Sequence, residues 1–400
     1  MGIASGINKK VVYKKEVTWS VPPGASGGQS LRNITSSLDL KKDTYASNEK
    51  RDDYQKADMR HGTRKVDGSI NGELSCGTYK DFMAAAVRGA FAAVVTSGAQ
   101  STISAQVASP QIQRSGGSFI TDGFKVGMVV RFAGMSSAGN NNRNFLVTTV
   151  TASALGGVFL DGGAAVVASA SGASTTITSA GKAAVMAISS HTDDSFSIEH
   201  WHSDIAQSEV FTGCKVAKLG VKLPATGMAT LQIDFIGRDM LTAQAAYYTA
   251  PAAQTTSGTL AAVNGALFVG TTQVGLLTSL DFDVNGNMST DAVVGSNTTP
   301  DVFEGPMDVT GNMTVYFQDA TFRDLFLNET EASIVAAFTA NNSGTADFMA
   351  FTMPRIKAGG ATKSDGIKGL MLTMPFTALR PVAALAGTYD TTLAIQDSLA

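Results

Sequence analysis

Residues 66–82 read VDGSINGELSCGTYKDF and residues 309–325 read VTGNMTVYFQDATFRDL, so the chain contains one segment twice at an offset of 243. Four of the seventeen positions are identical, and five more carry similar side chains. The identical ones are Val66, Gly68, Thr78 and Asp81, which recur as Val309, Gly311, Thr321 and Asp324. Because self-similarity at a fixed offset is typical of chains built from repeated units, we predict two copies of one structural unit.

Two further matches extend the repeat. Upstream, residues 37–40 match residues 279–282 at an offset of 242. The downstream match, at an offset of 153, pairs Gly213, Lys215 and Leu219 with Gly366, Lys368 and Leu372. Since the offset falls from 243 to 153, the first copy is expected to contain an insertion of about 90 residues that the second copy lacks. Composition places it at residues 98–184, where only 7 of 87 residues are charged.

The domain organisation follows from these offsets. We predict a first, discontinuous domain at residues 1–97 and 185–245 and an inserted small β-domain at residues 98–184. A second domain should cover residues 246–400. Each piece is long enough to bury a core of its own.

Each copy is predicted to consist of antiparallel strands with one packing helix. Apolar and polar residues alternate in residues 66–74 and 309–317, as they do in half-buried strands. A helix should follow, with Thr78 or Thr321 as its N-cap and an acidic residue three positions later. The residues expected on its apolar side are Tyr79, Phe82, Met83, Ala86, Val87, Ala90 and Phe91, with Phe322, Leu325 and Phe326 in the second copy.

Further strands are expected after the helix. Alternation resumes in residues 216–223 and, after a turn at residues 224–227, in residues 229–235. Residues 370–376 repeat the pattern of residues 229–235. The fold class is therefore predicted to be mainly β, with antiparallel sheets that form sandwiches or barrels.

The insertion is predicted to be purely β. Short strands at residues 126–132, 145–151 and 157–160, with a turn at residues 140–142, have the spacing of a β-sandwich. It carries no convergent polar cluster. We expect an outward, separable, decorating domain.

Composition excludes several classes of protein. With 44% hydrophobic and 16% charged residues, the chain is not intrinsically disordered. The longest apolar run, residues 82–95, is broken by Arg88 and is too short for a membrane helix. No secretory signal is visible at the N-terminus, and Cys76 and Cys214 are too few for a disulfide scaffold. We expect both to be buried thiols in a protein made in a reducing compartment.

The charge is unevenly distributed. Residues 1–65 hold 13 Lys or Arg against 7 Asp or Glu, whereas residues 185–400 hold 10 against 21. An acidic body with a basic N-terminal segment argues against a nucleic-acid-binding protein, which needs a broad basic face.

Histidine is the first place to look for a metal or catalytic site. His200 and His202 flank Trp201, with Glu199 and Asp204 nearby, and a spacing of two places both imidazoles on one strand face. A third ligand is not indicated, and no zinc-type Cys/His spacing is present. We therefore expect a solvated strand face with two exposed imidazoles.

Other motifs also favour structural interpretations. Residues 191–194 (HTDD) favour a turn over a catalytic dyad, and residues 24–28 (GASGG) favour a flexible loop over a nucleophile elbow. Residues 281–287 (DFDVNGN) resemble a calcium loop but lack its bidentate Glu, so a hairpin turn is preferred. No phosphate-binding loop is present. We predict no catalytic, metal or cofactor-binding residues and no enzymatic activity.

Three segments in a defined order resemble a known family. They are residues 66–74 (VDGSINGEL) with the helix that follows, residues 194–203 with Phe211-Thr212-Gly213, and residues 308–314 (DVTGNMT) with residues 322–326 (FRDLF). In this order they are similar to the tail tube proteins, or major tail proteins, of bacteriophages with long non-contractile tails. Residues 123–127 and 144–147 are similar to a β-module embedded in some of these proteins. The resemblance covers most of residues 30–385.

The resemblance implies a structural virion protein, assembled in the host cytoplasm into the phage tail and not in a membrane. Its subunits would form rings whose inner strands join into one barrel, and the rings would stack into a tube that conducts DNA. The tape measure protein and DNA would be partners in the lumen. Ring closure would pair the open strand edges, and an acidic lumen would repel phosphate.

The duplication also bears on symmetry. Rings of this family built from a single tube domain contain six copies, so three chains with two domains each would fill the same positions. We favour such a trimer, with approximate sixfold symmetry, over a hexamer of full chains. Two alternatives from other classes remain at this point: an adhesin on a virion or cell surface with the insertion as its binding head, and a hydrolase with a hidden site.

Overall fold

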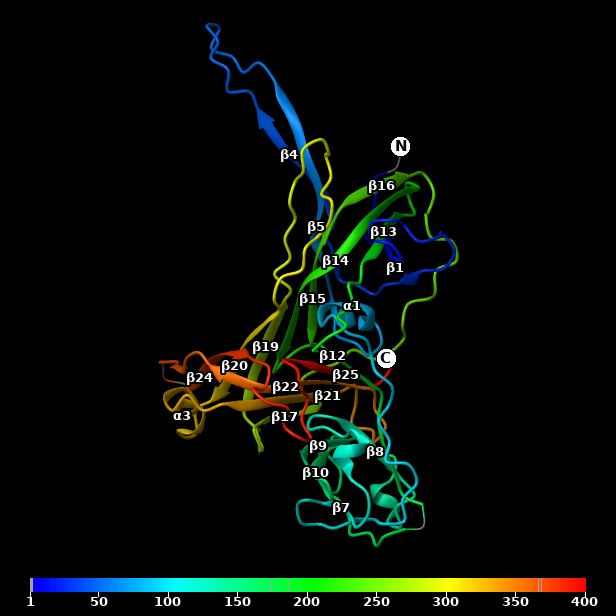
Figure 1. Ribbon diagram of the computed structural model, residues 1–400, viewed down its shortest axis with the longest axis vertical. Coiled ribbons are helices and arrows are strands. Elements are labelled where there is room, and N and C mark those ends of the chain that lie inside the picture. Colours follow the sequence, from blue (N-terminus) through cyan, green and yellow to red (C-terminus); the bar gives the residue numbers. More distant parts are fainter. Residues whose placement is uncertain (1–2, 173, 187, 366, 368) are drawn as a thin grey trace.

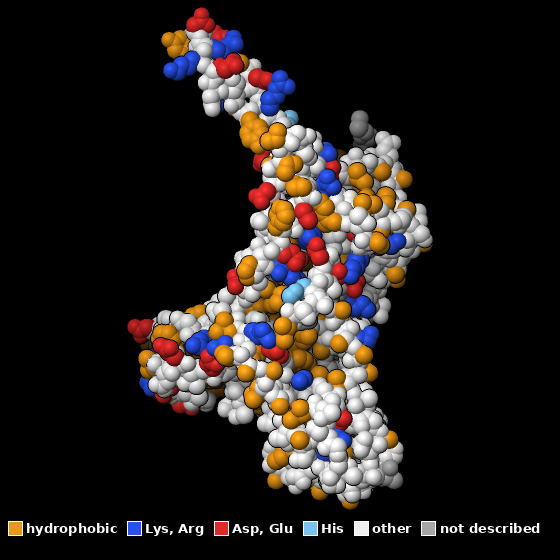
Figure 2. All heavy atoms as spheres, viewed as in Figure 1, with side chains coloured by type: hydrophobic (Ala, Val, Ile, Leu, Met, Phe, Trp, Pro, Cys, Tyr) orange, Lys and Arg blue, Asp and Glu red, His pale blue; other side chains and the backbone are white. Residues whose placement is uncertain are grey.

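The computed structural model describes residues 3–172, 174–186, 188–365, 367 and 369–400. The fold is mainly β with antiparallel pairing, as predicted. The molecule is elongated, with a two-stranded arm at one end, the insertion at the other, and α3 on a lateral extension (Figure 1). Charged side chains of both signs gather at the tip of the arm and at the end that carries α3 (Figure 2).

The helices are α1 (Lys80–Ala86), α2 (Phe119–Asp122) and α3 (Thr321–Leu327), with 3₁₀ turns at Gly6–Asn8 and Ala138–Asn140. The strands up to the end of the insertion are β1 (Lys9–Lys15), β2 (Gln29–Ser30), β3 (Thr35–Ser36), β4 (Asp39–Ala46), β5 (Met59–Glu73), β6 (Ile103–Ala105), β7 (Ile112–Arg114), β8 (Val129–Ala133), β9 (Phe145–Val150), β10 (Ala154–Phe159), β11 (Thr176–Ser179) and β12 (Lys182–Val185). The later strands are β13 (Phe196–His202), β14 (Gln207–Pro224), β15 (Thr230–Gly237), β16 (Asp239–Ala243), β17 (Gly265–Val269), β18 (Thr272–Gln273), β19 (Leu277–Asn285), β20 (Asp308–Tyr316), β21 (Ala332–Thr339), β22 (Phe348–Ala358), β23 (Thr362–Lys363), β24 (Met371–Ala378) and β25 (Ala394–Asp397).

The strands form two sheets. The smaller one has six strands, all from the insertion, in the order β11-β8-β9-β10-β7-β6. The larger one has nineteen strands, and its central part runs β4-β5-β15-β14-β19-β20-β24 with every neighbouring pair antiparallel. The strand direction turns progressively across this series, from β5 upright to β24 lying across the view (Figure 1).

The strand registers repeat within the chain. Ile70 of β5 lies opposite Ile233 of β15, and Met313 of β20 lies opposite Met374 of β24. The pairs β13–β14 and β21–β22 share a register shift, after Phe196 in one and after Ala332 in the other. We call β1–β5, α1 and β13–β16 the first half, and β17–β25 with α3 the second half. A shared irregularity at equivalent positions supports the duplication.

The registers correct the upstream sequence match. Leu40 lies opposite Val66 and Val284 lies opposite Val309, so equivalent residues are 244 positions apart instead of 242. A shift of two leaves every side chain on the same face of a strand, because the side-chain period is two. The hydrophobic pattern alone therefore could not detect the shift.

The downstream match is also wrong. Leu219 lies in β14, whereas Leu372 lies in β24, which takes the place of β15. The counterparts of β14 are β22 and β23. Thr362 of β23 pairs with β24 in the same way as Gly220 of β14 pairs with β15. Gly366 and Lys368 lie outside the described residues. The match of residues 370–376 with residues 229–235 is confirmed by the pairing of β24 with β20.

Both halves contain the predicted helix, but neither helix has the predicted cap. The N-caps are Tyr79 and Ala320, and neither makes a side-chain capping hydrogen bond. Thr78 Oγ1 bonds the hydroxyls of Ser75 and Thr255 instead, at 2.7 and 2.6 Å. The connection from strand to helix is two residues shorter in the second half, so the matched threonines are not equivalent.

The two helices differ in burial. Phe82 of α1 packs on Tyr13, Phe196 and Phe235, with ring centroids 4.5, 4.8 and 5.3 Å away. In the second half the positions of Tyr13 and Phe196 are held by Val269 and Ala332, which are much smaller. No residue of α3 is buried. Of the residues expected on the apolar side of α1, Ala90 and Phe91 lie beyond its end.

The insertion is not purely β, because it contains the short helix α2. The three predicted strands are present as β8, β9 and β10. The insertion, which we expected to be separable, packs against the second half. Its buried residues Val129, Leu146, Leu160 and Ala180 form one apolar cluster with Ala266, Phe268, Val335, Ala337, Phe348 and Ala350 of the second half. Gln396 of β25 reinforces this contact, accepting from Val129 N–H at 2.8 Å and donating to Val129 O at 3.0 Å.

Candidate functional site

The most extensive candidate site is the polar face of the central sheet. Along each strand, side chains alternate between the buried core and this face. On β19, for example, Leu280, Phe282 and Val284 are buried, whereas Asp281 and Asp283 are partly exposed. We use the term polar face for the side chains that point away from the core on six strands. These strands are β15, β19, β20 and β24, with residues 65–73 of β5 and residues 218–224 of β14.

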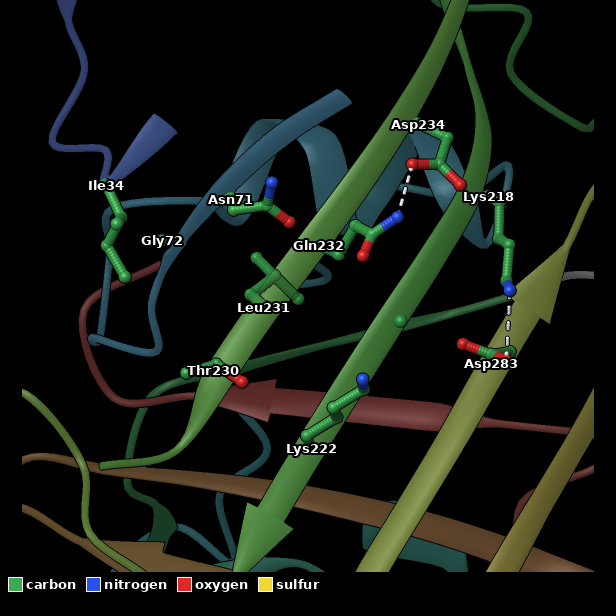
Figure 3. A pocket seen from close by; sticks show the side chains of 11 residues that line it. Ile34, Asn71, Gly72, Lys218, Lys222, Thr230, Leu231, Gln232, Asp234 and Asp283 are labelled. Carbon is green, nitrogen blue, oxygen red and sulfur yellow. Dashed lines mark hydrogen bonds and ion pairs between the residues drawn. The ribbon is translucent and has the colours of Figure 1, made fainter. Parts of the chain in front are cut away.

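Acidic side chains outnumber basic ones on the polar face. The acidic residues are Asp67, Glu73, Asp234, Asp281, Asp283 and Asp308, and the basic residues are Lys65, Lys218 and Lys222. Lys218 Nζ lies 3.0 Å from Asp283 Oδ2 (Figure 3). Gly220 leaves room for this carboxylate, since a Cβ at that position would lie 2.7 Å from Asp283 Oδ1. The face as a whole carries net negative charge.

The polar face is hollowed only shallowly. One hollow of about 340 Å³ lies over β5, β15 and β14, between Asn71, Gln232 and Lys222 (Figure 3). A second, of about 450 Å³, continues over β19, β20 and β24, between Asp281, Thr310 and Thr377. The two share Lys222 and Asp283, so they form one continuous depression along the sheet.

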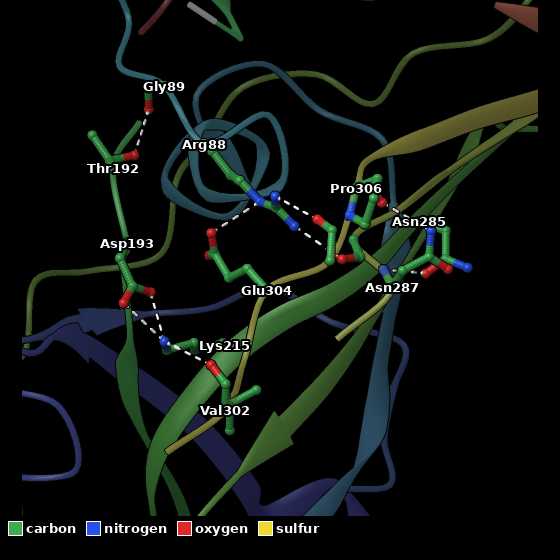
Figure 4. A network of polar contacts seen from close by, with 12 residues as sticks. Arg88, Gly89, Thr192, Asp193, Lys215, Asn285, Asn287, Val302, Glu304 and Pro306 are labelled. Atoms are coloured by element: carbon green, nitrogen blue, oxygen red, sulfur yellow. Dashed lines mark hydrogen bonds and ion pairs between the residues drawn. The ribbon is translucent and has the colours of Figure 1, made fainter. Parts of the chain in front are cut away.

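A buried polar network holds the second half against the first. Arg88, at the end of α1, donates to Gly305 O at 2.7 Å and Gly286 O at 2.9 Å, and its Nε lies 3.2 Å from Glu304 (Figure 4). Lys215 donates to Asp193 at 2.9 Å and to Val302 O at 3.0 Å. Both basic side chains are almost fully buried. Their partners on residues 286–305 anchor the β19–β20 connection on the first half.

The histidine pair lies on one strand face, but the expectation of two exposed imidazoles is wrong. His200 is buried, with Nε2 2.7 Å from Ser36 Oγ, and His202 is half-buried. His200 Nδ1 and His202 Nε2 lie 4.0 and 3.8 Å from Glu209 Oε2. Burial, followed by the charges of Lys9 and His202, lowers the pKa of His200 to about 3. A neutral, packed imidazole is the result.

Glu199 and Asp204 do not join the histidines. Glu199 points to the other face of β13, where it accepts hydrogen bonds from Ser208 Oγ and from the backbone N–H groups of Tyr247 and Tyr248. Asp204 accepts from Ser5 N–H at 2.6 Å. Among the described residues, no three His, Cys, Asp or Glu side chains gather as a metal site would require.

The remaining sequence motifs, at residues 191–194, 24–28 and 281–287, make structural contacts. Asp193 and Asp194, in irregular backbone before β13, pair with Lys215 and Lys15. Residues 24–28 form a loop, as predicted. Gly27 N–H donates a hydrogen bond to Thr249 O at 3.0 Å and fixes this loop. The predicted hairpin turn at residues 281–287 is wrong, because β19 continues through Asn285.

The cysteine thiols and the lengths of the helices also bear on function. Cys76 and Cys214 are buried and free, as predicted, and burial raises the pKa of both thiols. Within the part of the chain that the structure describes, no helix has the length and apolar character needed to span a bilayer.

The chain thus combines a duplicated β-fold with a long polar sheet face, and its sequence matches a known protein family. A family model described as "Phage tail tube protein" matches residues 6–378. The chain belongs to the phage tail tube protein family. It is thus a structural component of the phage tail that self-assembles into a stacked tube. A search of curated proteins finds no match to this chain.

Family membership makes the polar face the surface of greatest functional interest, and sequence reasoning located it only in part. The signal that could have found it was the alternation through Asp281 and Asp283, which we assigned to a turn. The acidic balance of residues 185–400 was the other signal, but the acids of the polar face come from both halves.

Proposed function

We propose that three copies of this chain form a ring whose polar sheet faces line a lumen, and that stacked rings conduct DNA out of a phage with a long non-contractile tail. The observation that carries the proposal is the pairing of β14 with β19. This pair joins the first half to the second through seven consecutive antiparallel residue pairs, from Lys218 opposite Asn285 to Pro224 opposite Ser279. Within one chain, two tube units are thus already joined edge to edge.

The same type of junction is available between chains. The central part of the larger sheet begins at β4 and continues beyond β24 to β22 and β23. Among the described residues, β4 pairs only with β5, and β23 pairs only with β24. β4 is the counterpart of β19, and β23 is the counterpart of part of β14. Unpaired strand edges are templates for pairing with another chain.

The in-chain junction sets the register of the proposed contact. Gly220 lies opposite Asp283, and their counterparts are Thr362 and Asp39. Thr362 of one chain should therefore lie opposite Asp39 of the next. Repeating this step closes the ring after three chains if the two halves are related by about a sixth of a turn.

The halves serve as tube domains in this proposal. We assign them to residues 1–97 with 185–245 and to residues 246–400, with residues 98–184 inserted in the first. Three insertions would then project at alternate positions of the ring. Assembly would take place in the host cytoplasm, around the tape measure protein.

The charge of the polar face suits a conduit for DNA. Basic side chains on such a surface would bind phosphate through counterion release and hold the polyanion in place. The acidic excess supplied by Asp234, Asp281, Asp283 and their neighbours repels phosphate instead.

Cysteine cross-linking tests the proposed junction. Thr362→Cys and Asp39→Cys, combined in one chain, should form inter-chain disulfides in assembled protein, because directly opposed antiparallel residues lie within disulfide reach. Pairing Thr362→Cys with Asp52→Cys, at the exposed tip of the arm, is the control. Failure of the first pair to cross-link in assembled tubes would contradict the junction.

A further inference from the structure

The C-terminal turn of α3 is apolar and partly exposed. Phe326 is 40% and Leu327 62% exposed, and Leu325 beside them is half-buried. A groove of about 360 Å³, lined by both apolar and polar side chains and bordered by Val269, Phe322 and Leu325, lies beside the same helix. Isolated exposed apolar side chains are common, whereas a contiguous group beside a groove indicates a contact surface.

The first half shows what covers the equivalent helix surface. α1 and α3 end alike: Arg88 and Glu329, each two residues beyond the helix end, have a φ of 50°, and the residues around them make matching backbone hydrogen bonds. This equivalence makes residues 84–86, three alanines, the counterparts of Leu325, Phe326 and Leu327.

In the first half the three alanines are buried, and β12, the strand at the end of the insertion that pairs with β25 of the second half, lies against their helix. α1 contacts β12, and Ala92 N–H donates to Ala183 O at 2.9 Å. Just before the helix, Gly77 N–H donates to Asp397 of β25 at 2.7 Å. β12 is paired with the outer edge of β25, so little room remains for side chains larger than alanine.

The equivalent edge for α3 belongs to another chain. β25 pairs with β22 as β16 pairs with β14, so β16 is the counterpart of β25. The rotation that carries the first half onto the second also carries the second half onto the first half of the next chain in the proposed ring. It therefore turns the arrangement in which α1 lies beside β12, with β25 behind it, into one in which α3 lies beside β16 of the next chain.

Both surfaces are free in a single chain. α3 and β16 lie well apart in the molecule, α3 on the lateral extension and β16 near the N-terminus (Figure 1). In the described ranges β16 pairs with β14 alone, and Leu241 on it is 47% exposed. Among the residues that the structure describes, no counterpart of β12 covers the outer edge of β16.

We propose that the apolar C-terminal turn of α3, formed by Leu325, Phe326 and Leu327, docks against the open edge of β16 in a second copy of this chain. The larger side chains occupy the space that β12 fills beside the alanines of α1. The proposal rests on the three-chain ring and adds a second contact to each interface between chains, outside the strand junction.

The test combines Leu327→Cys and Leu241→Cys in the full-length chain and treats assembled protein with a short bismaleimide. Cys76 and Cys214 are buried and therefore protected. We expect chains cross-linked to one another. The matched control combines Leu241→Cys with Leu385→Cys, because Leu385 is 68% exposed but belongs neither to α3 nor to the lining of the groove beside it. A second measurement uses Leu327→Lys, which should fold with an unchanged melting temperature yet assemble poorly, whereas Leu385→Lys should assemble normally.

The outcomes separate this contact from the ring itself. If Thr362→Cys and Asp39→Cys cross-link but the Leu327–Leu241 pair does not, the α3 contact is overturned and the ring stands. Equal cross-linking of the Leu385 control, or normal assembly of Leu327→Lys, also overturns the contact. If neither engineered pair cross-links, both proposals fail.

Discussion

Leu219 of the first half lies directly opposite Val284 of the second half in the antiparallel pair β14–β19. Both side chains are buried, at 0% and 1% exposure, so the junction between the halves is continuous with the core on one side of the sheet. On the other side, the polar face crosses the junction without a break. Each half therefore completes the sheet of the other, as neighbouring subunits of a barrel would.

The buried Lys215 should contribute to stability through the connection that it anchors. Lys215→Ala removes its ion pair with Asp193 and its hydrogen bond to Val302 O, and we expect the free energy of unfolding to fall by about 2 kcal/mol. Lys218→Ala, which removes a partly exposed ion pair, should cost less than about 1 kcal/mol. Chemical denaturation of both variants measures the difference. Equal losses would contradict the assigned role of Lys215.

His200 should make stability depend on pH. Its pKa is about 3 in the folded chain and near 6.5 in the unfolded chain, so the unfolded state binds the proton more readily. The stabilisation is complete above pH 6.5 and is lost as pH falls from 6.5 toward 3. We expect His200→Gln to flatten the pH dependence of unfolding in this window. His61→Gln, on the exposed arm, is the control, and an unchanged profile in His200→Gln would contradict the expectation.

Charge reversal on the polar face should make the tube retain DNA. Asp281→Lys adds a basic side chain to the proposed lumen, and we expect assembled tubes to bind duplex DNA with an affinity that falls steeply with salt. Asp52→Lys, at the tip of the arm, makes the same charge change away from this face. Binding measured across a salt series distinguishes them. Equal DNA binding by the two variants would argue against a lumen lined by the polar face.

Deletion of residues 98–184 should impair solubility. The deletion uncovers Phe268, Val335 and Phe348, which the insertion buries, and large new apolar patches favour aggregation. The sequence pattern suggested the opposite, an outward and separable domain. Removing the arm tip, residues 48–57, should leave solubility intact, because these residues are exposed. Soluble, ring-forming protein after deletion of residues 98–184 would refute the structural role of the insertion.

Local patterns predicted much of the fold. Alternation located β5, β14, β15, β20 and β24, and the repeat revealed that β20 is the counterpart of β5. The pattern could not distinguish the matched offset of 242 residues from the true spacing of 244 residues. Two alignments of a strand that differ by two residues place the same side chains on the same face. The Thr78 match failed for a related reason: a two-residue difference in the strand–helix connection leaves similar letters at positions that are not equivalent.

The candidate site was harder to predict than the fold. Asp281 and Asp283 lie in the middle of β19, but their acidic, Asn- and Gly-flanked sequence is typical of a turn. His200 looked exposed because neighbouring residues are polar, yet Ser36 from a distant strand covers it. Both errors arise from contacts between segments far apart in the chain, which no local pattern contains.

The mass of a single ring tests the central proposal most directly. Native mass spectrometry of rings released from assembled tubes should give three chains of 41.4 kDa each, because every chain supplies two tube units. Six chains in one ring would contradict the proposal, since the second half would then lie outside the barrel or enlarge it to twelve units.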